Sequence, residues 1–222
     1  LSKAIALDPE FARAYASLSE CYAYDVFYGY VERDPKETFA LARKAVEIDP
    51  QEASARRALG WAHLLNRDHS SAIAELKIAI ELNPSDAHSY SYLGFSKAYS
   101  GLAEEALEYF RSALKLSPQD PFIGWFHTGM ALALLFLQRH EESVESARKA
   151  FQQPPIVPLG RLHFLSALGH LGRKEEAAKV LVELLEIDPQ WAILVAERRL
   201  PFGDNAYRDI HLEGLRKAGM PE

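Results

Sequence analysis

The sequence predicts an all-α protein, a right-handed α-solenoid of antiparallel helix pairs. Prolines recur 34 residues apart, at Pro50, Pro84 and Pro118 and again at Pro155 and Pro189. Small residues recur with the same offset, in Leu59-Gly60 and Leu93-Gly94 and in Ala72 and Ala106. A fixed period of this length indicates one helix pair per repeat, since a single pair cannot bury its apolar face without stacked neighbours.

Each recurring residue type has a place in such a pair, whose first helix is called helix A and whose second is called helix B. A glycine in helix A, such as Gly60, lets helix B approach closely. The turn between the helices needs a residue at positive φ, which Gly101 and Gly172 supply. Glutamate pairs begin several helices B, where they favour the positive end of the helix dipole. The proline ends helix B because it has no N–H donor.

The pattern resembles the tetratricopeptide repeat (TPR). On that template residues 1–9 end a truncated repeat, five repeats follow, and residues 190–222 form capping helices; the repeats cover residues 10–50, 51–84, 85–118, 119–155 and 156–189. The predicted closing helix runs from Asn205 to Lys217 with a polar outer face. Because Leu1 begins within a repeat, we expect the chain to be the C-terminal part of a longer polypeptide.

Composition excludes several functional classes. The net charge of −6 over 222 residues argues against nucleic-acid binding by this segment. The longest apolar run, Met130 to Leu137, is shorter than the about 20 residues that span a bilayer, so membrane insertion is not expected. The first residues lack the apolar core of a signal peptide. A single cysteine, Cys21, excludes an internal disulfide and fits a reducing compartment, so the predicted location is the cytoplasm.

A search for catalytic chemistry finds no site, so the sequence predicts no catalytic, cofactor-binding or metal-binding residue. Gly169-His170-Leu171-Gly172 resembles a phosphate loop only faintly and is better interpreted as a helix end with its turn. His140-Glu141-Glu142 lacks the second histidine of a zinc helix. His163 and His170 share a helical face without a carboxylate or cysteine, which favours packing over metal binding. Cys21 is expected to be a buried structural thiol.

The resemblance implies that helix A lines a concave groove through its second, fifth, ninth and twelfth or thirteenth positions. Aromatic and arginine side chains at these positions suit recognition of a protein or peptide; the alternative is that they fill the inside of the superhelix. The positions are occupied by Arg13, Glu20, Arg57, Trp61, Leu65, His88, Phe95, Tyr99, Trp125, Thr128, Phe136 and His170. The lysine and asparagine of a chaperone-tail clamp are absent.

An aromatic run in the first, longer pair is a second candidate surface. Tyr24, Phe27 and Tyr28 could form a patch that docks a neighbouring domain of the same chain or a second copy in a homodimer. The alternative is a lengthened helix that folds over its own partner helix.

Two segments and the C-terminal end, Leu212-Glu213-Gly214-Leu215-Arg216-Lys217-Ala218-Gly219-Met220-Pro221-Glu222, resemble the TPR region that follows the catalytic domain in bacterial class III adenylate/guanylate cyclases. The two segments are Leu82-Asn83-Pro84-Ser85-Asp86-Ala87 and Gly172-Arg173-Lys174-Glu175-Glu176-Ala177. The resemblance implies a non-catalytic regulatory appendage of a nucleotide cyclase, and no catalytic residue of that family has a counterpart here. Similar repeats follow winged-helix domains in transcription regulators, which is one alternative, and a free-standing adaptor is another.

Overall fold

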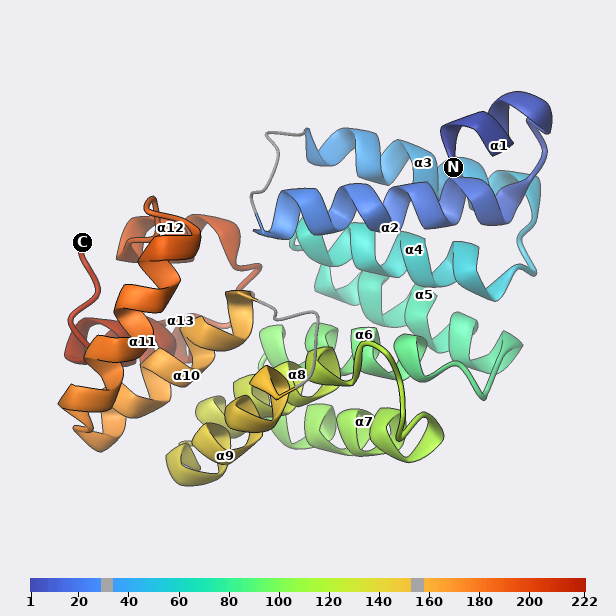
Figure 1. The fold of residues 1–222 in the computed structure, drawn as a ribbon. Helices are drawn as coiled ribbons and strands as arrows, with labels where there is room; N and C mark the ends of the chain where they lie inside the picture. The colour runs from blue at the N-terminus through green and yellow to red at the C-terminus, as the bar shows by residue number, and fades with distance from the viewer. Residues whose placement is uncertain (29–33, 153–157) are drawn as a thin grey trace. The chain divides into compact units, whose positions relative to one another are not determined.

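The computed structural model describes residues 1–28, 34–152 and 158–222. These residues form thirteen helices and no strand, as the sequence predicts (Figure 1). The helices are α1 (Ser2–Leu7), α2 (Ala12–Tyr28), α3 (Pro35–Ile48), α4 (Ala53–Leu65), α5 (His69–Leu82), α6 (Ala87–Tyr99), α7 (Ala103–Leu116), α8 (Ile123–Phe136), α9 (His140–Phe151), α10 (Pro158–Leu171), α11 (Lys174–Ile187), α12 (Ile193–Arg199) and α13 (Asn205–Lys217).

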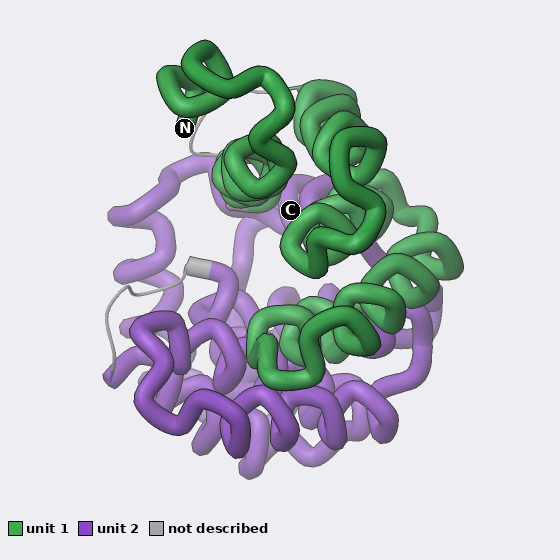
Figure 2. The backbone as a smooth tube through the Cα atoms, turned by 90° about the vertical axis from the view of Figure 1, so that its right-hand side faces the viewer, with its two compact units in different colours: residues 1–96 green, residues 97–222 purple. Residues whose placement is uncertain are grey.

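The chain divides into two compact units, which Figure 2 colours separately. Unit 1 comprises Leu1–Ser96 and unit 2 comprises Lys97–Glu222, so the boundary falls inside α6. In the predicted repeats, α2, α4, α6, α8 and α10 take the place of helix A, and α3, α5, α7, α9 and α11 that of helix B. The division into five repeats stays a prediction.

Local sequence explains where the helices begin and end. The side chain of Asp68 accepts a hydrogen bond from the backbone N–H of Ser71 at the start of α5, and Asp204 does the same for Tyr207 at the start of α13. Such caps satisfy N–H groups that the first helical turn leaves without partners. Four of the helix-B prolines follow C-cap residues with an extended or irregular backbone: Pro50, Pro84, Pro118 and Pro189. The fifth, Pro155, lies outside the described residues.

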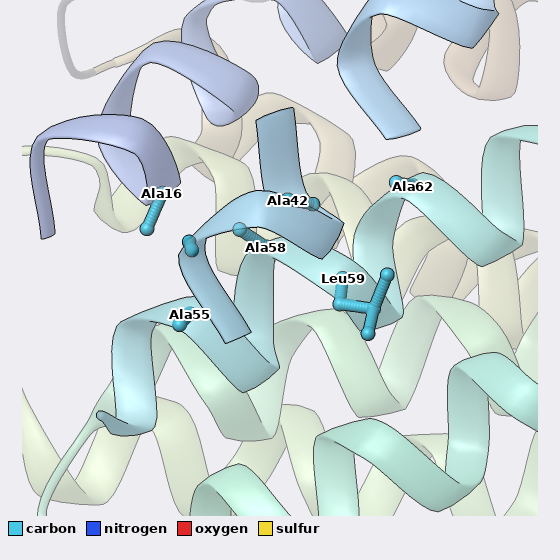
Figure 3. Packing of buried hydrophobic residues seen from close by; sticks show 7 residues of the cluster. Ala16, Ala42, Ala55, Ala58, Leu59 and Ala62 are labelled. Carbon is cyan, nitrogen blue, oxygen red and sulfur yellow. The ribbon is translucent and has the colours of Figure 1, made fainter. Parts of the chain in front are cut away.

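Alanines form much of the core of unit 1 (Figure 3). The buried cluster brings α2, α3 and α4 together through Ala16, Ala42, Ala45, Ala55, Ala58, Leu59 and Ala62. Small side chains allow the helix backbones to approach, and Gly60 shows how little room remains. A Cβ atom added to Gly60 would lie 2.6 Å from Cγ of Leu76 on α5. The predicted role of this glycine is therefore confirmed.

The turns between paired helices need a residue in the left-handed region. Gly101 has φ 94° and Gly172 has φ 67°, as predicted from the sequence. Two other turns contain non-glycine residues in the same region, Arg67 with φ 61° and Gln138 with φ 58°. The left-handed conformation costs a non-glycine residue about 1–2 kcal/mol, so packing of the flanking helices maintains these two turns.

Unit 2 has a more apolar core. Helix α8 is buried around most of its circumference, from Gly124 to Phe136. A Cβ atom at Gly129 would lie 2.1 Å from the ring of Phe110 on α7. Ser143, at a position where the repeat favours alanine, donates a hydrogen bond from Oγ to the carbonyl of Ala131 at 2.8 Å. This bond explains how a hydroxyl is accommodated in the α8–α9 contact.

None of the helices in the described ranges has both the length and the apolar character needed to cross a membrane.

Candidate binding surfaces

An arginine joins three helices A of unit 1. Arg57 of α4 donates to both carboxylate oxygens of Glu20 on α2, at 2.7 and 3.2 Å. It also donates to Asp86, the residue that precedes α6. Asp86 accepts further bonds from the Ser89 hydroxyl at 2.6 Å and from the His88 backbone N–H at 3.2 Å. A bidentate pair on one side and a second carboxylate on the other fix the guanidinium in place.

Burial and charge act in opposite directions in this cluster. Burial alone would raise the pKa of Asp86, but Arg57 and the Ser89 hydroxyl outweigh it and lower that pKa below 3.8. Burial alone would lower the pKa of Arg57, but Glu20 and Asp86 raise it above its ordinary value. Both Arg57 and Asp86 are therefore charged at neutral pH. We call Glu20, Arg57 and Asp86 the arginine cluster.

A second ion pair lies nearer the solvent. Arg13 of α2 donates to Glu52, the N-cap residue of α4, at 3.0 Å, with 66% of the arginine side chain exposed. Glu52 also accepts from the backbone and hydroxyl of Ser54. Partial burial would raise the pKa of Glu52, but these bonds and Arg13 outweigh it and lower that pKa. Most of the Arg13 side chain therefore faces solvent even though its guanidinium is paired with Glu52.

An aromatic stack is the third feature of unit 1. The ring of Trp61 lies 4.6 Å from that of Tyr92, nearly parallel, and 5.4 Å from that of Phe27, edge to face. The hydroxyls of Tyr24 and Tyr92 are 2.8 Å apart and share a hydrogen bond. Burial raises the pKa of Tyr24 to about 12 and also raises that of Tyr92, so both phenols stay protonated. Phe95 packs edge to face on Trp61 at 6.1 Å.

The predicted groove residues of unit 1 therefore fall into two groups. Trp61 and Phe95 have no exposed surface, which favours the alternative that they fill the interior. Arg13, Glu20, Arg57, Leu65 and His88 keep some exposure. In the predicted aromatic patch, Phe27 is buried and Tyr24 is bonded within the unit, while the side chain of Tyr28 lies outside the described part of the structure. A role of either set in binding stays a prediction.

The helices A of unit 2 are covered by the C-terminal segment of the chain. The ring of Phe136 stacks on that of Tyr207 at 4.6 Å, and Tyr99 contacts the ring of Phe202 at 5.6 Å. The imidazole of His170 lies 2.8 Å from the carbonyl oxygen of Ile210. Three residues that the sequence placed in the groove thus meet the segment that contains α13. Trp125 and Thr128 are buried as well.

A pair of histidines lies at the centre of this contact. Nδ1 of His163 on α10 and Nε2 of His211 on α13 are 2.8 Å apart, and neither side chain is exposed. Burial lowers the pKa of His211 to about 3, with a smaller contribution from His170. Burial and His211 lower the pKa of His163 well below 6.5. Both imidazoles are therefore neutral at pH 7.

Acidification is expected to weaken unit 2 through this pair. The folded pKa of His211 lies below the unfolded value of 6.5, so its contribution to stability is complete above pH 6.5 and decreases until about pH 3. At pH 5 the loss from His211 alone is about 2 kcal/mol. His211→Gln keeps a polar partner for His163 but does not titrate. Urea unfolding at pH 7 and pH 5 should show a smaller pH effect in this variant; an equal decrease in both proteins would refute the assignment.

Other sequence candidates have ordinary surroundings. Cys21 is exposed, so the prediction of a buried thiol is wrong. Its neighbours Ser19 and Ala23 are the small residues that face the core. Partial burial, Glu20 and Asp25 raise the pKa of the thiol, which opposes thiolate formation. His140 stacks on His170 at 4.5 Å. The described residues contain no group of three or more potential metal ligands.

Comparison with known families identifies the repeats. A model of the tetratricopeptide repeat matches residues 37–87 and 72–121, and a second model of the same repeat matches residues 162–190. Together these matches span roughly half of the chain. The chain belongs to the tetratricopeptide-repeat family. None of the curated protein sequences compared with it matches at a significant level.

Solved structures of such repeats are similar to this chain. The TPR protein TTC0263 of Thermus thermophilus matches with a TM-score of 0.66 and 18% identity, over 92% of this chain and 99% of that one. PilF of Pseudomonas aeruginosa matches with a TM-score of 0.63 and 20% identity, over 90% and 88%. YrrB, described as a TPR protein with an unusual peptide-binding site, has a TM-score of 0.50 and 17% identity, over 85% and 92%. These similarities establish the fold.

Proposed function

We propose that the chain is a non-catalytic protein-binding module that holds a helix or peptide of a partner on its helices A. The observation that supports this most directly lies in unit 2, where Tyr99, Phe136 and His170 contact the segment that contains α13. At two of these positions, Phe136 and His170, the residues pack against α13 itself, and Tyr99 packs against Phe202, which shortly precedes α13 in the same chain. The stacking of repeats provides an extended face for such contacts.

In unit 1 the same positions offer a charged rim. Arg13 on α2 is mostly exposed, and Glu20, Arg57 and His88 on α2, α4 and α6 keep a smaller exposed fraction. A carboxylate of a partner can replace water at the exposed side of the Arg13 guanidinium, since 66% of the arginine side chain is exposed while it pairs with Glu52. Unit 1 is therefore proposed to bind an acidic or C-terminal peptide segment through Arg13.

Selection of peptides from a random displayed library tests this function. Peptides selected on the full chain are expected to bind in solution with dissociation constants of about 1–100 μM. Arg13→Glu on helix A should weaken binding about tenfold or more, whereas Lys44→Glu, an exposed charge reversal on helix B, should not. The proposal fails if no selected peptide binds below about 1 mM, or if both reversals have the same effect.

A finer proposal concerns the protein around this chain. The resemblance of the ending Leu212–Glu222 supports a place after the catalytic domain of a bacterial adenylate/guanylate cyclase, where the repeats would position or dimerise that domain. In this structure the C-terminal end contributes to the core of unit 2, because Leu215 and Met220 are buried. Reading the coding sequence upstream of Leu1 tests the proposal. A cyclase domain supports it, and a winged-helix domain or a start codon at Leu1 refutes it.

A further inference from the structure

A small cavity of unit 2 lies between α8 and its neighbours α7 and α9. Its volume is about 240 Å³, and it is partly open to solvent. Apolar walls come from Leu114 of α7 and from Met130 and Leu134 of α8, whereas α9 contributes polar and charged side chains. Because α7 and α9 are both helices B, we call this cavity the helix-B pocket. It contains none of the predicted groove residues.

The charged side chains of the pocket follow one face of α9. Glu142, Glu145 and Lys149 all line it, and their spacing of three and four residues places them in a row along the helix. The helix rises about 6 Å from Glu145 to Lys149 and about 10 Å from Glu142 to Lys149. The pocket is therefore negative at one end and positive at the other, with the apolar side chain of Met130 on the opposite wall.

One charge of each sign is available to a ligand. Glu142 already accepts from Arg139 through both oxygens, at 2.6 and 2.7 Å. Glu145 and Lys149 are exposed, and within the described ranges their side chains make no ion pair or hydrogen bond. At i and i+4 the two side chains have the spacing of a helical ion pair, yet they remain apart in this structure.

The histidine of the pocket does not add a second cation. His127 is half-buried, and the Ser146 hydroxyl donates to its backbone carbonyl at 3.0 Å. Burial, and then the charge of Lys149, lower the pKa of the imidazole below 6.5, so the ring is neutral at pH 7. Lys149 thus supplies the positive charge at this end of the pocket.

Size and charge together define the ligand. The volume is below the roughly 300–1,000 Å³ of sites for drug-sized molecules, and an α-helix about 10–12 Å wide does not fit. The apolar walls favour methylene groups. A molecule that satisfies both ends has an ammonium group for Glu145 and a carboxylate for Lys149, about one to two helical turns apart.

We propose that the helix-B pocket binds an ω-amino carboxylate, a small zwitterion with a short methylene chain between its two charges. Its ammonium group pairs with Glu145, its carboxylate pairs with Lys149, and its chain lies against Met130. This site goes beyond the proposed function, because it takes a small molecule between helices B rather than a protein on helices A.

Three matched ligands test the proposal on the full wild-type chain by calorimetry at pH 7. They are 6-aminohexanoate, hexanoate, which lacks the ammonium group, and hexylammonium, which lacks the carboxylate. The zwitterion is expected to bind with a dissociation constant of about 0.1–1 mM, and each singly charged analogue at least tenfold more weakly. Equal affinity for the three, or no binding of 6-aminohexanoate at about 10 mM, overturns the proposal.

Variants locate the site. Lys149→Gln should weaken binding of 6-aminohexanoate at least tenfold, whereas Lys115→Gln, which removes an exposed cation of α7 outside the pocket, should not. Met130→Trp keeps both charges but fills the cavity and should abolish binding. Equal losses from the two lysine variants would show general attraction to basic side chains and refute the site. If Met130→Trp does not fold, the comparison of the lysine variants decides.

The titration of His127, followed by NMR, reports the position of the carboxylate. A carboxylate beside Lys149 offsets the effect of that lysine on the imidazole, so 6-aminohexanoate should raise the pKa of His127. Hexylammonium should not raise it. A pKa that 6-aminohexanoate leaves unchanged would place the ligand elsewhere and overturn the proposal. None of these outcomes alters the Arg13 test of unit 1.

Discussion

Replacing Gly214 by alanine is expected to lower the free energy of unfolding of unit 2 by about 3 kcal/mol. The new Cβ atom would lie 2.3 Å from Oγ and 2.4 Å from the carbonyl oxygen of Ser166, and 2.6 Å from the His170 ring. A side-chain oxygen can rotate away, but a helical carbonyl can move only if the backbone of α10 or α13 shifts. The shift would also lengthen the contact between His163 and His211, 2.8 Å in the native chain.

Thermal unfolding measures this effect, with a decrease in the midpoint of roughly 6–12 °C for a unit of this size. Glu213→Ala is the matched control, because it changes the neighbouring residue on the exposed side of the same helix. Its midpoint should stay within experimental error of the wild type. Equal midpoints for Gly214→Ala and wild type would mean that the two helices do not cross this closely.

Arg57→Ala is expected to destabilise unit 1 by about 3 kcal/mol at pH 7. The substitution leaves the carboxylates of Glu20 and Asp86 largely buried without the cation between them, and their side chains are only 15% and 11% exposed. Arg13→Ala is the control, since it removes an exposed arginine from the same face and should cost less than about 1 kcal/mol. Urea unfolding of the three proteins gives both differences.

The pH dependence of the stability difference between Arg57→Ala and the wild type distinguishes a loss of electrostatic stabilisation from a loss of packing. In the wild type the pKa of Asp86 is held below 3.8, so its contribution is present above that pH and is lost as pH falls through the folded value. Arg57→Ala lacks this contribution, and the difference between variant and wild type should shrink below about pH 4. A difference that is constant with pH would indicate that Arg57 acts through the packing of its aliphatic stem.

The sequence predicts the helices well where the determinants are local. Prolines such as Pro50 and Pro84, like the glycines at 101 and 172, restrict their own backbone, so their effect can be predicted without knowledge of the fold. Arg67 and Gln138 cannot, because nothing in their side chains requires a left-handed conformation; the flanking helices impose it. The template predicts a buried position for Cys21, but the first pair is longer than the template, and Ser19 and Ala23 take the buried positions while Cys21 is exposed.

The candidate surfaces were only partly predictable. Helix-A positions identify Glu20 and Arg57. Asp86, the third member of the arginine cluster, immediately precedes α6 and therefore lies outside the helix positions that the template covers. Burial of Tyr99 and Phe136 depends on Phe202 and Tyr207, which lie far along the chain and outside the repeats. The same applies to His163, whose partner His211 is 48 residues away. Side chains brought together by the closing helix leave no periodic signal in the repeats.

The central claim, that helices A hold the partner, is tested most directly by the exchange footprint of a library-selected peptide on the full chain. The peptide is expected to slow amide exchange at the N-terminal ends of α2, α4 and α6 around Arg13, Glu52 and His88, and to leave α3 and α5 unchanged. Slowed exchange confined to α3 and α5 would place the partner on the helices B and contradict the account.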